Sequence, residues 1–309
     1  MRCLCVSGGG FQALYGVLLL ETLEREGGPL RDGFDTFCGT SAGAITAAAA
    51  AFGVPMGELK LGFVERGARA FTRKRSSWAP DIVRRLSEPR YDPQPLRMLV
   101  REICGDAVMA DVPSLLVTAT RLHDGAAVLF SGLTHPDVKV EDAVCASAAA
   151  PVMFPAVMVD GALHADGAIF ANAPDLLAMA HVMRFHGGLD HMLSIGSMNA
   201  SPPMGEPASP AMGALHWLRG NRIFRTMIGS QADMTERVAR AAMRDLYTRI
   251  DADPAFPLRD DVGLDKADVK AVRAASVAAA GSEPLIRAWA ERFMPGPEDE
   301  PEDGSPPAP

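Results

Sequence analysis

Residues 34–52 read FDTFCGTSAGAITAAAAAF and contain the signals of a strand, a tight turn and a helix. The short apolar segment Phe34 to Cys38 predicts a buried β-strand. The alanine-rich residues 44–52 favour a helix that can lie close against a sheet. The residues between them, Gly39-Thr40-Ser41-Ala42-Gly43, therefore join a strand to a helix through a sharp turn.

The same order of elements occurs once before. The apolar residues 3–6 predict a buried strand that stops at Ser7-Gly8-Gly9-Gly10, and residues 12–26 have helical periodicity. Two strand-turn-helix units within the first 52 residues predict a parallel sheet covered by helices. We therefore expect an α/β protein with three layers, α/β/α, around a mainly parallel central sheet.

The rest of the chain fits one main domain of residues 1–294 followed by a tail. Residues 55–110 are mostly helical in pattern and basic, which indicates a helical insertion or cap. Further strands are expected at 114–120, 126–130, 156–159 and 191–195, and helices at 142–148, 174–185 and, as one or two amphipathic helices, 211–248. Residues 295–309, PGPEDEPEDGSPPAP, have almost nothing to bury and predict a disordered acidic tail.

Composition excludes several functional classes. A formal net charge of −8 argues against a partner that is a nucleic-acid polymer. The five cysteines are odd in number and contain no C-x-x-C pair, so neither a disulfide framework nor a zinc site is indicated. The N-terminus does not resemble a signal peptide, and no segment reaches the ~20 apolar residues that span a bilayer. We expect a cytoplasmic protein that needs no metal and no cofactor.

The turn at residues 39–43 has the pattern G-x-S-x-G of a nucleophile elbow, in which a strained turn exposes a serine hydroxyl. Gly39 and Gly43 give the backbone room to turn, with Thr40 and Ala42 beside the serine. The helix that follows directs the positive end of its dipole at the site. Ser41 is therefore the candidate nucleophile.

The glycines Gly8, Gly9 and Gly10 are a candidate oxyanion hole, because consecutive glycines let backbone N–H groups converge on one point. The alternative for such a run is a plain tight turn. A second alternative is the dinucleotide-binding fingerprint G-x-G-x-x-[GA], which residues 8–13 satisfy. That fingerprint needs an acidic residue at the end of the second strand. Here that strand ends at the serine elbow, and Asp35 lies near its start.

Asp166-Gly167-Ala168 lies 125 residues after the serine, in an expected loop. A serine hydroxyl needs a base within hydrogen-bond reach, and a carboxylate of ordinary pKa is a weak base. Asp166 can therefore serve only in a site that raises its pKa or stabilises the oxyanion strongly. An isolated Asp-Gly pair is otherwise a turn.

The three motifs in this order resemble the patatin-like phospholipases, which carry a glycine-rich loop, a G-x-S-x-G elbow and a later D-G-[GA] motif. Residues 146–155 and 172–174 are also similar to segments on either side of the family's aspartate. The resemblance covers about residues 1–200. It implies Ser41 as nucleophile, Asp166 as base without a histidine, and the N–H groups of Gly9 and Gly10 as oxyanion donors. The family often has Arg or Lys in the glycine loop where this chain has Gln12.

Within that family, four segments are similar to bacterial antiphage phospholipases that a cyclic nucleotide activates. These segments are residues 8–15, residues 91–106, Gln231, and residues 247–250. This similarity implies an enzyme of antiviral defence that cleaves inner-membrane phospholipid, with a cyclic-nucleotide activator and peripheral membrane contact. A homo-oligomer is expected as well.

Three alternatives remain open on the sequence. Histidines at 181, 186, 191 and 216 follow Asp166, so the order Ser–Asp–His of an α/β-hydrolase triad is available. The chain can also be a binding protein for lipid or nucleotide that has no catalytic activity. Finally, the basic segment 66–85, in which Arg66, Arg69 and Arg73 share one helix face, is either a solvated surface or a contact for anionic lipid or ligand.

Overall fold

A mixed eight-stranded sheet forms the centre of the protein. The computed structural model describes residues 1–72, 88–198, 213, 217, 222–256, 258, 261 and 263–294. The strands follow the order β5–β6–β3–β2–β1–β7–β8, and β4 pairs with β3. Their bounds are Arg2–Val6 (β1), Thr36–Gly39 (β2), Leu115–Arg121 (β3), Ala126–Ser131 (β4), Val157–Val159 (β5), Ala162–Asp166 (β6), His191–Ile195 (β7) and Tyr247–Ile250 (β8).

Strands β3, β2, β1, β7 and β8 run parallel to one another. Residues 3–6 of β1 and all of β7 are buried, as expected for parallel strands that helices cover on both faces. The remaining pairs, β3 with β4, β3 with β6 and β5 with β6, are antiparallel. The expectation of a mainly parallel sheet is confirmed.

Strand β3 carries two strands end to end along one edge. Its residues 115–117 pair with β2 and its residues 119–121 pair with β6, while β4 pairs along the opposite edge. Because β2 is parallel and β6 antiparallel to β3, the carboxyl ends of β2 and β6 meet beside Thr118. This arrangement brings the residues after Gly39 close to Asp166.

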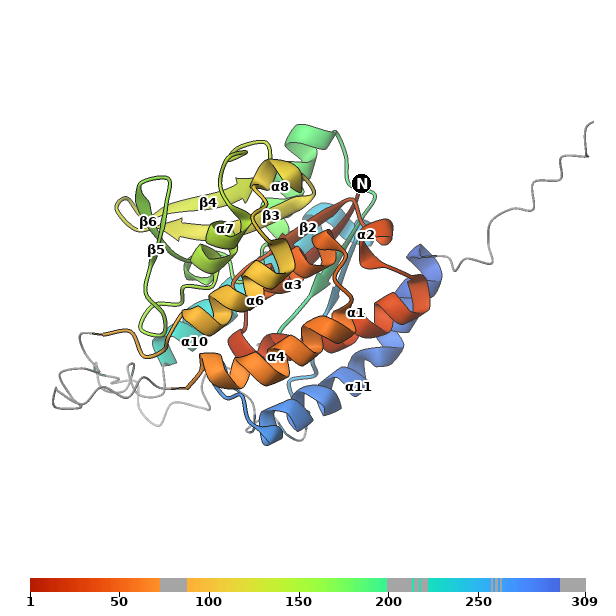
Figure 1. Ribbon diagram of the computed structural model, residues 1–309. Coiled ribbons are helices and arrows are strands. Elements are labelled where there is room, and N and C mark those ends of the chain that lie inside the picture. The colour runs from red at the N-terminus through yellow and green to blue at the C-terminus, as the bar shows by residue number, and fades with distance from the viewer. Residues whose placement is uncertain are drawn as a thin grey trace, which may run out of the picture.

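Helices cover the two faces of the sheet (Figure 1). In β1, Leu4 and Val6 pack into the core under one set of helices, and Cys3 and Cys5 into the core under the other set. The first set comprises α1 (Leu14–Gly27), α3 (Ala42–Phe52), α4 (Met56–Ala70), α6 (Gln94–Cys104), α7 (Val140–Ser147) and α11 (Val269–Phe293). The second comprises α8 (Asp175–His186) and α10 (Arg222–Met243).

Short helical turns connect these elements. They are η1 (Gly10–Ala13), α2 (Leu30–Gly33), η2 (Met109–Asp111), η3 (Gly167–Ile169) and η5 (Arg244–Leu246).

Several predicted elements differ from the observed ones. Asp166 is the last residue of strand β6 and not part of a loop. Helix α10 ends at Met243, and residues 247–250 form the edge strand β8, although the expected helical range 211–248 includes the first two of them. Helix α11 has no counterpart in the sequence prediction. The tail 295–309, His216 and residues 73–85 of the basic segment 66–85 lie outside the described residues.

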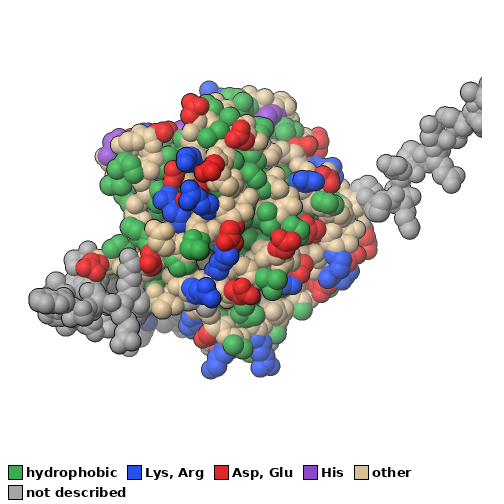
Figure 2. All heavy atoms as spheres, in the orientation of Figure 1, with side chains coloured by type: hydrophobic (Ala, Val, Ile, Leu, Met, Phe, Trp, Pro, Cys, Tyr) green, Lys and Arg blue, Asp and Glu red, His purple; other side chains and the backbone are tan. Residues whose placement is uncertain are grey.

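The charged surface is mixed in sign. Figure 2 shows Lys and Arg beside Asp and Glu over the face formed by α1, α4, α6 and α11. Ion pairs account for much of this mixing, including Arg97 of α6 with Glu141 of α7 and Arg25 of α1 with Glu283 of α11. Within the described ranges, no helix is both long enough and apolar enough to cross a bilayer.

Helix α11 is held on the sheet by aromatic packing. The ring of Trp289 stacks on Phe34 at a centroid distance of 5.4 Å, and Trp289 is 4% exposed. The Tyr15 hydroxyl of α1 donates to Ser282 Oγ of α11 at 2.8 Å. The long helix therefore closes the core over α1.

We predict that Trp289→Ala lowers the free energy of unfolding by about 3–5 kcal/mol, because it leaves a cavity where a large ring was packed. Denaturant unfolding followed by circular dichroism measures this loss. Val269→Ala on the same helix is the control, since Val269 is 85% exposed, and it should change stability by less than about 0.5 kcal/mol. Equal effects of the two substitutions would contradict the packing role.

Candidate active site

The elbow between β2 and α3 has the strained geometry that its sequence predicts. Ser41 has φ 56° and ψ −128°, a backbone conformation that non-glycine residues rarely adopt. A side chain at Gly39 would lie 2.4 Å from the carbonyl oxygen of Gly43, and one at Gly43 would lie 2.3 Å from that of Val6. Both glycines are therefore required by close backbone contacts, and the turn holds the Ser41 hydroxyl at the start of a helix.

Buried side chains hold the elbow from behind. The Ser41 N–H donates to Ser147 Oγ at the end of α7, at 2.8 Å. The Thr40 hydroxyl lies 2.8 Å from Thr118 Oγ1 and 2.8 Å from the carbonyl oxygen of Ala171. Thr40, Thr118 and Ser147 are all fully buried. The strained turn is thus fixed by β3, by α7 and by the segment that follows Asp166.

Asp166 lies within hydrogen-bond reach of this serine. Ser41 Oγ donates to Asp166 Oδ2 at 2.7 Å, although 125 residues separate the two in sequence. The other oxygen, Oδ1, accepts from the N–H of Ala168 at 2.8 Å. Gly167 allows this turn, because a side chain there would lie 2.1 Å from Thr118 Oγ1. The Asp-Gly-Ala motif thus directs one carboxylate oxygen at the serine and fixes the other.

Burial changes the basicity of this carboxylate. Asp166 is 3% exposed, and the loss of water around the charge raises its pKa from 3.8 to about 7. The hydrogen bonds from Ala168 and Ser41 act in the opposite direction and are outweighed. A carboxylate of this pKa is a far better proton acceptor than an ordinary aspartate.

The glycine loop lies beside the same serine, and its three glycines have different environments. The N–H of Gly8 donates to the carbonyl oxygen of Asn172 at 2.9 Å, so Gly8 does not offer a donor to a substrate. Gly9 and Gly10 line the pocket. Among the described residues, neither of their N–H groups has a hydrogen-bond acceptor. Of the three glycines in the candidate oxyanion hole, Gly9 and Gly10 therefore remain as candidate donors, the two that the family resemblance implies.

Gly10 is confined by a distant segment. Its φ is +55°, and a side chain there would lie 2.2 Å from the carbonyl oxygen of Leu264. The same oxygen accepts from the N–H of Phe11 at 2.9 Å. The loop is therefore clamped by the chain that follows β8.

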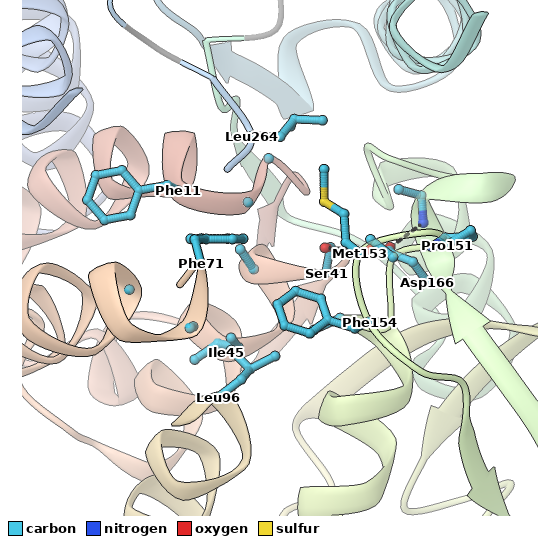
Figure 3. A pocket seen from close by; sticks show the side chains of 18 of the residues that line it. Phe11, Ser41, Ile45, Phe71, Leu96, Pro151, Met153, Phe154, Asp166 and Leu264 are labelled. Carbon is cyan, nitrogen blue, oxygen red and sulfur yellow. Dashed lines mark hydrogen bonds between the residues drawn. The ribbon is translucent and has the colours of Figure 1, made fainter. Parts of the chain in front are cut away.

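An apolar pocket of about 170 Å³ opens beside Ser41. Figure 3 shows Ser41 and Asp166 at one side of it, with Phe71 and Phe154 nearby and Ile45 and Leu96 deeper between the helices. Helix α10 contributes further apolar side chains to its lining. The apolar side chains that line it include Phe11, Ile45, Phe63, Ala70, Phe71, Leu96, Leu99, Val152, Met153, Phe154, Phe224, Met227, Ile228 and Leu264. Such a lining suits a hydrocarbon chain next to an ester bond.

Comparison with known proteins agrees with this geometry. Residues 4–179, which include the glycine loop, the elbow and Asp166, match the patatin-like phospholipase family. The chain belongs to this family.

The similar proteins include enzymes from bacteria and from animals. A cGAMP-activated phospholipase of Pseudomonas aeruginosa is 32% identical over 286 residues, which cover 87% of this chain and 83% of that protein. A cGAMP-activated phospholipase of Vibrio cholerae is 29% identical and covers 60% of this chain and 58% of that protein. The human calcium-independent phospholipase A2-gamma is 28% identical over 58% of this chain and 25% of its own length.

The rival mechanisms lack support at this patatin-like site. Of the histidines in the described part of the chain, none lines the pocket. His191 lies on β7. Its ring is stacked on that of Phe293 with 4.0 Å between the ring centroids, and its Nε2 lies 3.0 Å from the hydroxyl oxygen of Thr248. Asp35, the acidic residue of the dinucleotide alternative, accepts a hydrogen bond from the N–H of Arg2 at 2.7 Å, at the opposite end of the strands from the glycine loop.

Two arginines also line the patatin pocket. Arg66 of α4 is one of the arginines expected on a basic helix face. Its Nη1 lies 2.5 Å from Glu102 Oε2 of α6, and its side chain is 29% exposed. Arg90 pairs with Asp265 at 3.1 Å. Arg66 therefore points between two helices toward the pocket, and is not part of a fully solvated face.

Several residues that support the site have no recognisable signal in the sequence. Leu264 clamps Gly10, and Ser197 contacts the glycine loop through a hydrogen bond to Gly8. Asn172 and Ser147 lie within segments 172–174 and 146–155, which the family resemblance covers, but the resemblance implies no contact for either residue. These contacts join segments far apart in sequence, and no local pattern marks them.

The raised pKa of Asp166 predicts a stability change. In the wild type, this group's contribution to stability is fully present below its unfolded pKa of 3.8 and is lost as the pH rises through about 7. Asp166→Asn removes that loss, so the melting temperature of the variant should exceed that of the wild type by several degrees at pH 8. The corresponding difference in the free energy of unfolding between the variant and the wild type is up to about 4 kcal/mol.

The difference in melting temperature should shrink on acidification to pH 5 and approach zero near pH 4. Scanning calorimetry or fluorimetry across this range measures it. A difference that stays constant with pH would show that Asp166 titrates normally.

Proposed function

We propose that the chain hydrolyses carboxylic ester bonds of membrane phospholipids, with Ser41 as nucleophile and Asp166 as general base. The observation that carries this proposal is the 2.7 Å hydrogen bond from Ser41 Oγ to a buried Asp166 carboxylate at the wall of an apolar pocket. An activated hydroxyl needs such a base. The apolar lining supports an acyl chain as the group that is held.

In the first half-reaction, Asp166 Oδ2 accepts the proton of Ser41 as Oγ attacks the ester carbonyl carbon. The carbonyl oxygen becomes negatively charged, and the N–H groups of Gly9 and Gly10 stabilise it. The intermediate then collapses, the bond to the alcohol oxygen breaks, and this oxygen receives the proton from Asp166. A lysophospholipid leaves and the acyl group remains on Ser41.

In the second half-reaction, Asp166 accepts a proton from water as the water oxygen attacks the acyl carbon. Collapse of the second intermediate breaks the bond to Ser41 Oγ, which takes the proton back. A free fatty acid is released. The positive end of the α3 dipole, which begins at Ala42, favours the negative charge in both steps.

A cyclic nucleotide of the cGAMP type is the proposed activator. The support is the Pseudomonas relative, which aligns along 87% of this chain and is named a cGAMP-activated phospholipase. On this proposal the enzyme acts in antiviral defence, as a cytoplasmic protein that contacts the inner membrane peripherally. Assembly into a homo-oligomer is part of the same proposal.

Ser41→Ala and Asp166→Asn should each lower fatty-acid release from phospholipid vesicles by at least about 10³-fold, because each removes one member of a pair that acts together. The assay is run with and without 3′,3′-cGAMP and other cyclic di- and trinucleotides. Ser276→Ala is the control, since Ser276 is exposed on α11 and its hydroxyl donates to the carbonyl oxygen of Val272 in the same helix.

Release that needs one nucleotide would support the activator. Release that survives Ser41→Ala would refute the mechanism. No release under any condition, with a Ser41 that does not react with fluorophosphonate, would favour a binding protein without catalytic activity.

Asp166 also predicts the pH dependence of activity. The base must be ionised, and its pKa is raised to about 7, so kcat/KM should rise tenfold per pH unit below 7 and level off above it. A soluble p-nitrophenyl ester as substrate separates this profile from effects of pH on lipid packing. A flat profile between pH 5 and 8 would contradict the assignment of Asp166 as base.

A further inference from the structure

A buried serine lies directly behind the glycine loop. Ser197, in the turn that follows β7, is 1% exposed, and its Oγ donates to the carbonyl oxygen of Gly8 at 2.5 Å. Nothing in the local sequence marks this residue, and the Ser–Asp mechanism does not use its hydroxyl. Its partner, however, belongs to the peptide unit that contains a proposed oxyanion donor.

The carbonyl of Gly8 and the N–H of Gly9 are parts of one planar peptide group. In a trans peptide these two groups point in opposite directions, and the protein has no cis peptide bonds among its described residues. A carbonyl held toward Ser197 therefore directs the N–H of Gly9 away from Ser197. Gly9 lines the pocket beside Ser41, and its N–H has no acceptor within the described part of the chain.

The loop is restrained on both sides of this peptide. The preceding N–H, of Gly8, donates to the carbonyl oxygen of Asn172 at 2.9 Å. A side chain at Gly9 would lie 2.6 Å from Ser197 Cβ, so the turn is in direct contact with the loop backbone. Rotation of the Gly8–Gly9 peptide would break the Ser197 hydrogen bond and leave a buried carbonyl without its partner.

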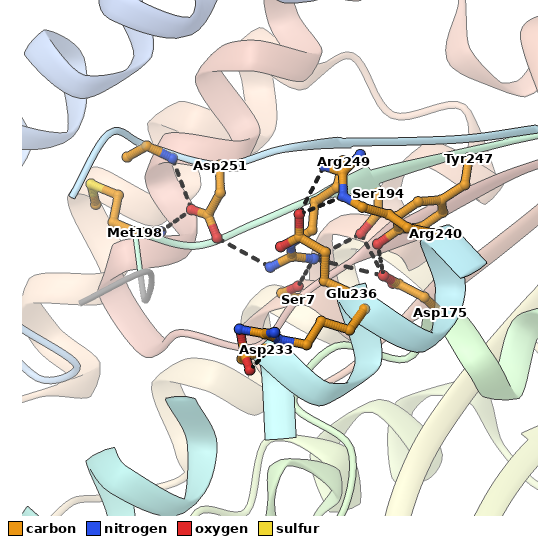
Figure 4. A network of polar contacts seen from close by, with 12 residues as sticks. Ser7, Asp175, Ser194, Met198, Asp233, Glu236, Arg240, Tyr247, Arg249 and Asp251 are labelled. Atoms are coloured by element: carbon orange, nitrogen blue, oxygen red, sulfur yellow. Dashed lines mark hydrogen bonds and ion pairs between the residues drawn. The ribbon is translucent and has the colours of Figure 1, made fainter. Parts of the chain in front are cut away.

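A buried ionic network holds Ser197 in place. Met198, the next residue, has φ 59°, an uncommon conformation for a non-glycine residue. Asp251 fixes it, because Asp251 Oδ1 accepts from the N–H of Met198 at 2.9 Å. The guanidinium of Arg249, on β8, donates to Asp251 Oδ2 at 3.1 Å (Figure 4).

The same guanidinium reaches the loop by a second route. Arg249 Nη1 lies 2.8 Å from Ser194 Oγ and 3.3 Å from Ser7 Oγ, at the start of the glycine loop. Ser194 Oγ and the Tyr247 hydroxyl both donate to Asp175 Oδ2, at 2.8 and 2.6 Å. The Arg249 side chain is 5% exposed, so this network forms a rigid support under the turn at Ser197.

We propose that Ser197 is a positioning residue for catalysis, which orients the Gly8–Gly9 peptide so that the Gly9 N–H faces the developing oxyanion. The inference rests on the acyl-hydrolase function proposed above. It adds a requirement that the Ser41–Asp166 pair does not contain. Ser197 acts on the transition state through a backbone group, and it neither touches substrate nor transfers a proton.

Ser197→Ala tests the proposal with a soluble p-nitrophenyl ester as substrate. The variant should lose about 10- to 100-fold in kcat, less than the 10²- to 10³-fold typical of removing a donor outright, because the N–H remains but is less well held. KM should change less than about twofold, since the oxyanion forms only after binding. The pH midpoint of the rate near 7 should not move, because Asp166 keeps its environment.

Two further measurements separate positioning from general damage to the fold. The rate at which a fluorophosphonate labels Ser41 should fall in parallel with kcat, because its phosphoryl oxygen takes the place of the oxyanion. Ser276→Ala, which also removes a serine hydroxyl that donates to a backbone carbonyl, should leave both rates unchanged.

The outcomes are distinguishable. A Ser197→Ala variant with wild-type kcat and labelling rate, beside a Ser41-dependent wild type, would overturn the positioning role alone. A loss of kcat accompanied by a shifted pH midpoint would also overturn it, because the variant would then have disturbed Asp166. Absence of Ser41-dependent hydrolysis and labelling in the wild type would overturn the acyl-hydrolase proposal, and this inference with it.

Discussion

The burial of one carboxylate is the constraint on which the rest of the site depends. Asp166 is withdrawn from water by the same packing that encloses the apolar pocket, and its two hydrogen bonds offset only part of that cost. An exposed aspartate at this position would be too weak a base for a serine hydroxyl. The protein therefore holds a destabilising group at the centre of its fold, and the large buried core around β1, β2 and β3 compensates for it.

The backbone around the site is also fixed by hydrogen bonds and close contacts. Ser41 adopts a conformation that costs on the order of 1–3 kcal/mol, and side chains from three segments fix it through Thr40, Thr118 and Ser147. Gly10 is clamped by Leu264, and Gly8 is bonded on both its N–H and its carbonyl. On the proposed mechanism, the groups that face the substrate are thus oriented before it arrives, as electrostatic stabilisation of a transition state requires.

The local parts of this arrangement were predictable from sequence, and the non-local parts were not. Glycines at 39 and 43, an apolar strand before them and alanines after them predict the elbow, because each residue acts on its immediate neighbours. Strand β8 is not among the predicted strands, and the expected helical range 211–248 extends into it, because Tyr247–Ile250 has only four residues and its strand character comes from pairing with β7. Helix α11 is not among the predicted helices. Its sequence contains Pro284, a residue that disfavours a helix interior, and the packing of its alanine-rich face along α1 is a contact between segments far apart in sequence.

The same distinction applies to the site. The order of three motifs suggested Ser41 and Asp166, but no property of residues 162–166 shows that their strand lies end to end with β2. Contacts of Ser197, Asn172 and Leu264 with the glycine loop depend on how distant segments pack. The candidate oxyanion hole also includes Gly8, because a run of glycines does not reveal which of its N–H groups already have an acceptor.

Strand β3 sets the distance between the ends of strands β2 and β6. Residue 117 pairs with the end of β2 and residue 119 pairs with Asp166, so a single residue, Thr118, sets the spacing between the two strand ends. An inserted residue at this position would lengthen that spacing by about 3.3 Å, more than the whole length of a hydrogen bond. The side chains of β3 beyond the insertion would also turn to the opposite face of the sheet, and Ser41 and Asp166 would no longer meet. Changes in chain length are therefore far less tolerable at Thr118 than in the turn between β3 and β4, where Gly125 has open space around it.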